Sequence, residues 1–426
     1  MEREYAFEMA TSSIRYGPGV TREVGLDLAE TGARRVMVLT DPRLASAGPA
    51  QTVLESLEQN GIRFRLFDQV RIEPTDASLQ EAIAVARSEP FEAFVAVGGG
   101  STLDTAKAAN LYSTYPPGDF LDYVNAPIGQ GLPVPGPLKP LYAIPTTAGT
   151  GSETTGVAIF DLAALHAKTG IAHRRLKPTL GLIDPENTRT MPRLVAASTG
   201  LDVLTHAIES YTALPFHQRP RPGRPILRPA YQGANPISDV WSWQAARLVD
   251  QYLIRAVENP EDDEARGRML LAASYAGVGF GNAGVTLPHG MSYPVSGLVK
   301  AFQPAGYPED RPLIPHGLAV VLNAPAAFRF TAPADPPRHL EAAAALGAQV
   351  EGARLEDAGD ILAERIIYFM RRLGVPNGLS AVGYTEADIP GLVQGALPQH
   401  RVLKLSPRPV NAEDLASIFR AALRYW

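Results

Sequence analysis

Asp202 and His206 are four residues apart in the stretch TGLDVLTHAIESY, which runs from Thr199 to Tyr211. Apolar residues recur at helical spacing in this stretch, and residues i and i+4 of a helix lie one above the other on the same face. A carboxylate oxygen and an imidazole nitrogen would therefore converge on one point, which is half of a divalent-metal site. An aspartate and a histidine on a helix surface would have the same spacing, so the pair alone decides nothing.

Two later histidines are candidates for the other half of this site. His289 lies in LPHGMSYP and His316 in IPHGL, so each follows a proline and precedes a glycine in an apolar setting. The chain contains 8 histidines. Finding two of them in matching contexts favours a metal site over three ordinary histidines.

The predicted elements place these residues in the second of two domains. Strand and helix patterns alternate early in the chain, with strands over 34–41, 62–70 and 91–97 and helices over 48–60, 77–88 and from about 101. This alternation predicts a parallel sheet covered by helices. Helical periodicity then dominates over 192–213, 237–257, 261–281, 317–331, 338–348, 356–373 and 412–425. We therefore predict an α/β domain over 1–191 and a helical domain over 192–426.

Composition limits the class of protein. A chain of 426 residues with 45% hydrophobic and 19% charged residues is typical of a soluble two-domain protein. The net charge of −5 indicates no nucleic-acid binding, and no apolar run reaches the ~18 residues of a membrane span. The absence of cysteine excludes disulfides, iron–sulfur clusters and thiol nucleophiles, and the N-terminal stretch carries charges where a signal peptide needs an apolar core. We expect a cytoplasmic protein whose partners are small molecules, with a homo-oligomer left open.

Two glycine-rich segments of the first domain are candidate cofactor contacts. GGGSTLD, Gly98 to Asp104, follows a strand and opens a helix, where backbone N–H groups can bind a pyrophosphate. PTTAGTGSE, Pro145 to Glu153, places hydroxyls and glycines at another strand end, where α/β domains bind ligands. Asp41 ends the strand 34–41 and could accept hydrogen bonds from a ribose. An ordinary glycine turn, a flexible loop and a strand-ending aspartate are the simpler alternatives.

A dinucleotide site facing a metal site predicts hydride transfer between a nicotinamide and a substrate whose oxygen binds the metal. A metal-dependent lyase that uses a nucleotide for redox cycling, as in dehydroquinate synthase-like folds, is one alternative. A sugar- or nucleotide-binding module without chemistry is another, and the clustered aspartate and histidines argue against it.

The segments GGGSTLDTAK, PTTAGTGSETT, LIDP, GLDVLTHAIESY, LPHGMSYP and IPHG, in this order, resemble the iron-containing (group III) alcohol dehydrogenases. The resemblance covers almost the whole chain and implies a Rossmann-like α/β domain, an all-α second domain, NAD as cofactor and one divalent metal, Fe²⁺ or Zn²⁺. The implied metal ligands are Asp202, His206, His289 and His316. The implied cofactor-binding residues are Asp41, Gly98, Gly99, Gly100, Ser101, Asp104, Thr146, Thr147, Thr150, Ser152 and Lys168.

Further segments, such as RPAYQGANPISDVW and HGMSYPVSGLVK, are similar to the hydroxyacid–oxoacid transhydrogenase branch of this family. That branch transfers hydride from 4-hydroxybutyrate to 2-oxoglutarate through NAD that stays on the enzyme. Tyr293 stands where the wider family has a histidine four residues after its third ligand, and it is a candidate catalytic residue. The alternative is an NAD-dependent alcohol dehydrogenase that acts on a primary alcohol or aldehyde with exchangeable NAD.

Substrates that carry carboxylates need cations in the binding site, and arginine suits this because its planar fork pairs both oxygens. The loop 214–236 follows the helix that bears Asp202 and contains Arg219, Arg221, Arg224 and Arg228. We predict that one or two of these arginines bind the distal carboxylate, with Arg228 as first choice. A solvated proline-rich loop is the alternative.

Overall fold

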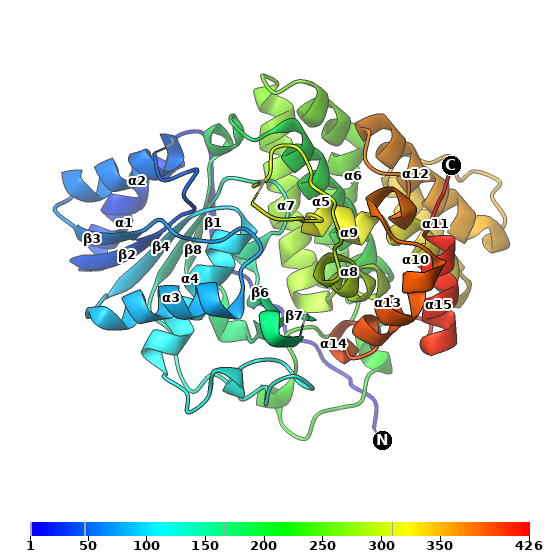
Figure 1. Ribbon diagram of the computed structural model, residues 1–426, viewed down its shortest axis with the longest axis horizontal. Coiled ribbons are helices and arrows are strands. Elements are labelled where there is room, and N and C mark those ends of the chain that lie inside the picture. The colour runs from blue at the N-terminus through cyan, green and yellow to red at the C-terminus, as the bar shows by residue number, and fades with distance from the viewer. Residues whose placement is uncertain (1, 47, 166, 309) are drawn as a thin grey trace. The chain divides into compact units, whose positions relative to one another are not determined.

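The computed structural model of the chain forms two compact units, and Figure 1 colours them along the sequence. One unit is Thr11–Met191, and the other combines Pro192–Trp426 with Met1–Ala10. The structure describes all residues except four: Met1, Ala47, His166 and Glu309.

The N-terminal segment packs with the helical unit, whereas the sequence analysis places it in the first domain. The Glu4 N–H donates to the Arg219 carbonyl at 2.8 Å. The Asn282 side chain makes two hydrogen bonds to the Ala10 backbone. Its Oδ1 accepts from the Ala10 N–H at 3.1 Å, and its Nδ2 donates to the Ala10 carbonyl at 2.9 Å. The α/β unit is therefore an insertion in the sequence of the helical unit.

A six-stranded parallel sheet forms the core of the α/β unit, which confirms the predicted fold class. Its order is β1-β8-β5-β4-β2-β3, with bounds β1 Ser13–Tyr16, β2 Arg35–Leu39, β3 Arg63–Phe67, β4 Ala93–Gly98, β5 Leu141–Pro145 and β8 Leu180–Ile183. The strands β2, β4 and β5 are buried almost throughout, because apolar residues fill both of their faces. Continuous apolar runs of this kind are typical of parallel strands covered on both sides.

Helices cover the two faces of this sheet (Figure 1). They are α1 Val24–Glu30, α2 Gly48–Gln59, α3 Asp76–Ser88 and α4 Gly100–Thr114. Val36 and Val38 of β2 pack in the cluster that includes α1 and α2, and Met37 and Leu39 pack with α3 and α4. Successive strand residues point to opposite faces, so one short apolar strand serves both layers. A separate antiparallel hairpin consists of β6 Val157–Leu162 and β7 Ala167–Ala172.

The helical unit is built around α5. Its helices are α5 Arg193–Thr212, α6 Pro236–Glu258, α7 Asp263–Ala283, α8 Leu287–Gly297, α9 His316–Val321, α10 Ala324–Thr331, α11 Pro336–Ala345, α12 Ala358–Leu373, α13 Ile389–Ala396, α14 His400–Leu403 and α15 Ala412–Ala421. α5 packs against α6, α7 and α9 and is buried on nearly all sides, as expected of a helix without a polar face. The sequence predicts one helix over 317–331, and the structure has two, α9 and α10. The prediction omits α8, α13 and α14.

Within the described part of the chain, no single helix is long and apolar enough to cross a membrane. α7 and α8 pass that test only as a pair, and they meet at a bend of 103°. Most residues of both helices are buried, as they are in α5. These helices form the apolar interior of the unit.

Candidate metal centre and cofactor site

Three of the four predicted metal ligands converge inside the helical unit. Asp202 and His206 lie one turn apart on α5, and His289 lies in the first turn of α8. The His206 Nδ1 is 3.7 Å from one carboxylate oxygen of Asp202, and the His289 Nε2 is 3.6 Å from the other. One ligand atom from each of the three residues lies within 4.8 Å of the other two.

The chemistry of this cluster fits a divalent cation. The His206 Nδ1 and the His289 Nε2 are buried, and neither has a hydrogen-bond partner among the residues that the structure describes. Burying such nitrogens unpaired costs free energy, so two of them beside one carboxylate indicate a ligand set. Burial, reinforced by the charges of His289 and His316, holds the pKa of His206 well below its usual value, which keeps the ring in its neutral, ligating form.

His316, the fourth predicted ligand, lies beside this cluster but outside the group of three. It is the first residue of α9, and its ring centroid is 5.2 Å from that of His289. The glycine after it is required by close packing, because a Cβ on Gly317 would lie 2.1 Å from the Ser198 carbonyl oxygen on α5. The His-Gly pattern therefore reflects a helix that begins directly against α5. The role of His316 as a ligand stays a prediction.

Glu209 is a residue of this site that the sequence analysis does not identify. It is fully buried on α5, and its Oε2 is hydrogen-bonded to the His289 Nδ1. Its Oε1 accepts the backbone N–H groups of Thr286 at 2.9 Å and His289 at 3.2 Å. A carboxylate on Nδ1 fixes the tautomer and orientation of a ligating histidine whose Nε2 faces the metal. Glu209 is seven residues after Asp202 and so lies on the same helix face, which is a signal available from sequence.

Tyr293, the predicted catalytic residue, lies one turn after His289 on α8 and is buried. Its hydroxyl accepts a hydrogen bond from the Arg401 Nη2 at 3.2 Å. The Arg401 guanidinium lies over the Tyr231 ring, with Cζ 4.7 Å from the ring centroid. Tyr231 in turn contacts Phe280, with ring centroids 6.5 Å apart. Arg401 and Tyr231 are further residues that the sequence analysis does not identify.

Arg219, Arg221 and Arg228 of the loop 214–236 have other partners in the structure. The Nε and Nη2 atoms of Arg228 donate to the two carboxylate oxygens of Glu4, each at 3.0 Å. Arg221 pairs with Glu2 at 2.9 Å, and Arg219 donates to the Tyr231 carbonyl. Because Glu4 already occupies the fork of Arg228, the structure does not support Arg228 as the carboxylate ligand.

Two loops of the α/β unit bring most of the predicted cofactor residues together. Gly98 ends β4, Gly99 links it to α4 and Gly100 begins α4, and the loop after β5 contains Thr146, Thr147 and Thr150. The Thr146 N–H donates to the Gly98 carbonyl at 3.0 Å. A Cβ on Gly100 would lie 2.5 Å from the Thr150 Cγ2, and one on Gly99 would lie 3.4 Å from the Thr147 Oγ1. The glycines therefore allow the loops to approach each other at the start of α4, where backbone N–H groups favour an anion.

Hydrogen bonds of Asp104 and Ser152 fix the two loops to each other. The Ser152 hydroxyl donates to the Asp104 Oδ1 at 2.6 Å and accepts from the Lys107 Nζ at 2.5 Å. The Asp104 Oδ2 accepts the Ile159 N–H at 2.9 Å, which joins α4 to β6. Burial, opposed by the charges of Asp104 and Glu153, lowers the pKa of Lys107 to about 8. Burial likewise raises the pKa of Asp104, and the charge of Lys107 opposes that shift. The network therefore pairs one buried acid with one buried base.

The remaining predicted cofactor residues also have partners within the unit. The Asp41 Oδ1 accepts the N–H groups of Arg43 at 2.9 Å and Leu44 at 3.2 Å, which forms the turn after β2. The Lys168 Nζ lies 2.6 Å from a carboxylate oxygen of Glu73 and 3.0 Å from one of Asp161. The Ser101 hydroxyl accepts the Glu73 N–H at 3.1 Å. Cofactor binding by Asp41, Ser101 and Lys168 stays a prediction.

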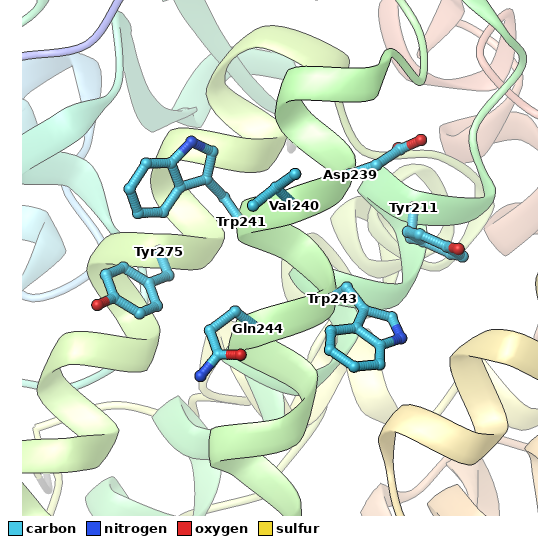
Figure 2. Close-up of a pocket in the computed structure, with 7 residues that line it drawn as sticks. All are labelled: Tyr211, Asp239, Val240, Trp241, Trp243, Gln244 and Tyr275. Carbon is cyan, nitrogen blue, oxygen red and sulfur yellow. The ribbon is translucent and has the colours of Figure 1, made fainter.

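A surface hollow of about 550 Å³ lies along α6 and contains none of the predicted site residues. Figure 2 shows its lining residues, which are Tyr211, Asp239, Val240, Trp241, Trp243, Gln244 and Tyr275. The Trp241 and Tyr275 rings contact each other with centroids 5.1 Å apart. The residues predicted to bind the metal and NAD therefore lie outside this hollow.

Comparison with known proteins identifies similar sequences along nearly the whole chain. The family model described as iron-containing alcohol dehydrogenase matches residues 11–185. The model described as Fe-containing alcohol dehydrogenase family, C-terminal, matches residues 230–423. Hydroxyacid-oxoacid transhydrogenase, mitochondrial, from Bos taurus is 60% identical over 424 residues, which is 99% of this chain and 91% of the relative. The protein of the same name from Homo sapiens is 59% identical with the same coverage.

Solved structures share the fold. A 1,3-propanediol oxidoreductase matches with a TM-score of 0.85 and 28% identity over 98% of this chain and 100% of that one. Sulfoacetaldehyde reductase from Bifidobacterium kashiwanohense, in complex with NAD⁺, matches with a TM-score of 0.80 and 27% identity over 99% of each chain. The prediction of a cytoplasmic location is wrong on this comparison, because the relatives from Bos taurus and Homo sapiens are named as mitochondrial proteins.

Proposed function

The chain belongs to the iron-containing alcohol dehydrogenase family, and from this premise we propose that it is a hydroxyacid–oxoacid transhydrogenase. It is an oxidoreductase of a family that uses a divalent metal and NAD(H). The observation that carries the proposal is the 60% identity over 99% of the chain to a relative of that name. The buried cluster of Asp202, His206 and His289 supports it, because its residue types suit a Lewis-acid metal.

The proposed reaction is a balanced exchange between two acids. 4-Hydroxybutyrate loses a hydride from C4 and a proton from its hydroxyl group, which gives succinic semialdehyde. 2-Oxoglutarate gains a hydride at C2 and a proton on its oxygen, which gives 2-hydroxyglutarate. Bound NAD would supply the hydride carrier for both half-reactions, so the exchange needs no external oxidant or reductant.

Asp202, His206 and His289 would hold the metal, with His316 beside them as the proposed fourth ligand. A divalent cation held there supplies Lewis acidity toward the alcohol or carbonyl oxygen of the substrate. Glu209 fixes the His289 ring, so its Nε2 stays aimed at the cluster. Two imidazoles and a carboxylate suit Fe²⁺ and Zn²⁺ alike, and the family description favours iron.

NAD is the proposed cofactor, with its pyrophosphate at the start of α4. The close approach of Gly100 to the loop that contains Thr150 supports this placement, because only a glycine backbone leaves room there. Asp41 follows β2, where an acidic side chain would bind a ribose and repel a 2′-phosphate.

The experiment that tests this function is incubation of the purified protein with 4-hydroxybutyrate and 2-oxoglutarate without added NAD. We expect succinic semialdehyde and 2-hydroxyglutarate in equal amounts. The alternative function is that of an alcohol dehydrogenase with exchangeable NAD. It predicts no product in this assay and NADH formation when NAD⁺ and a primary alcohol are supplied.

A further inference from the structure

We infer that Arg401 binds the substrate carboxylate that lies farthest from the reacting carbon, an inference that rests on the proposed function. Arg401 belongs to the short helix α14 of the helical unit, and no predicted motif includes it. Its guanidinium is held beside the buried cluster by two tyrosines, Tyr231 and Tyr293.

The first argument is the incomplete set of partners around Arg401. Its Nη2 donates to the Tyr293 hydroxyl at 3.2 Å, and its Cζ lies 4.7 Å from the Tyr231 ring centroid. Its Nη1 is buried and has no hydrogen-bond acceptor among the described residues. The side chains that act on its charge within the described part of the chain are Tyr293 and Tyr231, and neither is a carboxylate. A buried charged donor without an acceptor costs free energy, and a carboxylate supplies two acceptors that match the arginine fork.

The second argument is the position of Arg401 relative to the metal ligands. Tyr293 is four residues after His289 on α8, so the two share a helix face. The Tyr231 ring contacts Phe280 at a centroid distance of 6.5 Å, and Phe280 stacks on His206 at 4.0 Å. Arg401 is thus connected to His206 through the rings of Tyr231 and Phe280, and its hydrogen-bond partner Tyr293 lies on the helix face that carries His289.

The third argument is the chemistry of the substrates. In 4-hydroxybutyrate, two methylene groups separate the reacting C4 from the carboxylate. In 2-oxoglutarate, two methylene groups separate the reacting C2 from the distal carboxylate. The two products have the same spacing. One cation at a fixed distance from the reacting carbon therefore serves all four species, and a single arginine is sufficient for both half-reactions.

The test compares substrates with and without the carboxylate. Arg401→Met should lower kcat/KM for 4-hydroxybutyrate by roughly ten- to a hundredfold, as expected for a lost charged hydrogen bond. The same variant should leave kcat/KM for butan-1-ol, which has the same carbon chain without the charge, within about twofold of wild type. Arg401→Lys keeps the charge without the fork and should recover part of the loss. Equal losses for both substrates would overturn the inference, because Arg401 would then only support Tyr293.

A binding measurement separates this inference from the proposed function. Butyrate carries the carboxylate but no reacting hydroxyl, so its calorimetric dissociation constant reports on Arg401 without any turnover. We expect Arg401→Met to weaken butyrate binding at least tenfold. Arg408→Met is the matched control, because Arg408 is exposed and lies over the Phe330 ring at 4.1 Å, and it should leave butyrate binding unchanged.

The outcomes of the two measurements are distinct. Wild-type protein that makes no 2-hydroxyglutarate from 2-oxoglutarate and 4-hydroxybutyrate overturns the proposed function, whatever butyrate does. Wild-type protein that makes it, together with an Arg401→Met variant that binds butyrate as tightly as wild type, overturns the role of Arg401 alone. If Arg401→Met fails to fold, as judged by circular dichroism, Arg401→Lys decides the question. Unchanged butyrate binding and unchanged kcat/KM for 4-hydroxybutyrate in Arg401→Lys would then overturn the inference.

Discussion

Glu209 binds His289 at two points: its Oε2 is hydrogen-bonded to the ring Nδ1, and its Oε1 accepts the backbone N–H at 3.2 Å. The first contact orients the ring, and the second fixes the start of α8. The helix that carries Asp202 and His206 is thereby joined to the helix that carries His289. One carboxylate therefore sets the geometry of the cluster without being a member of it.

Glu209→Gln should weaken Zn²⁺ binding by roughly ten- to a hundredfold, because a neutral amide holds the His289 ring less strongly than a carboxylate does. Calorimetric titration of the metal-free protein with Zn²⁺ measures this loss. Glu341→Gln is the control, since Glu341 is exposed and its carboxylate accepts a hydrogen bond from the Tyr211 hydroxyl at 2.6 Å. Equal Zn²⁺ affinities for both variants would contradict the positioning role of Glu209.

His206→Ala should remove the bound metal, because it deletes one of the three converging ligand atoms. His316→Ala should weaken metal binding at least roughly tenfold if His316 is the fourth ligand. Elemental analysis of the purified variants reports metal content directly, with the exposed His217→Ala variant as control. Full metal content in His206→Ala would rule out the assigned site. Full metal content and unchanged metal affinity in His316→Ala would show that the site has only the three other ligands.

Asp41→Asn should narrow the preference for NAD over NADP by roughly tenfold or more, because it removes a negative charge expected to face the 2′-phosphate. Asparagine keeps the side-chain oxygen that accepts the Arg43 and Leu44 N–H groups, so the turn after β2 should survive. Dissociation constants for both nucleotides, measured on wild type and variant, give the ratio. Wild-type protein that binds NADP as tightly as NAD would refute the role of Asp41.

Gly100→Ala should weaken NAD binding or destabilise the fold by about 1–3 kcal/mol through overpacking. The added Cβ would lie 2.5 Å from the Thr150 Cγ2, so the two loops must separate. The gain in helix propensity, about 1 kcal/mol, does not offset this. Gly48→Ala at the start of α2 is the control, because its added Cβ would meet no described residue within 4 Å outside its own turn of the chain. NAD titration and urea unfolding measure both effects, and matching behaviour of the two variants would count against the loop contact.

Lys107 gives the α/β unit a pH-dependent contribution to stability. Burial lowers the pKa of Lys107 from 10.5 to about 8 in the folded protein. Between these values the unfolded chain holds a proton that the folded chain lacks, so this contribution to stability rises with pH by up to about 1.4 kcal/mol per unit. It is fully present above pH 10.5 and is lost as the pH falls through about 8. Comparing urea unfolding of wild type and Lys107→Met at pH 7.5 and pH 9.5 tests this, and a difference independent of pH would contradict it.

Regular periodicity made the parallel sheet and most long helices predictable, and the spacing of Asp202 and His206 identified two of the three clustered ligands. α8 was not predicted, because Pro288 and Pro294 interrupt its helical pattern. The structure tolerates Pro288 in the first turn, where backbone N–H groups have no helical partner anyway. The sequence analysis does not predict β1, because a strand of four mostly exposed residues has little apolar pattern.

The residues that support the site were harder to identify from sequence. Glu209 is seven residues after Asp202 and so lies on the same face of α5, yet a glutamate in a helix normally indicates a solvated surface. Arg401 follows no pattern, and its surroundings depend on Tyr231 and Tyr293, which are distant in sequence. The loop 214–236 has a clear sequence pattern, but that pattern led to a prediction that the structure does not support. Its dense arginines suggested a carboxylate site, whereas Arg228 pairs with Glu4 near the start of the chain.

That pairing bears on the order in which the chain can fold during synthesis. Residues 11–191 are complete, and free to fold as a unit, while the ribosome is still making the helices that follow. Glu4 pairs with Arg228, and Ala10 is hydrogen-bonded to Asn282. The segment that holds Glu4 and Ala10 therefore has no partners until more than half of the protein has been translated. The part of the helical unit that is made first is therefore the part that docks late.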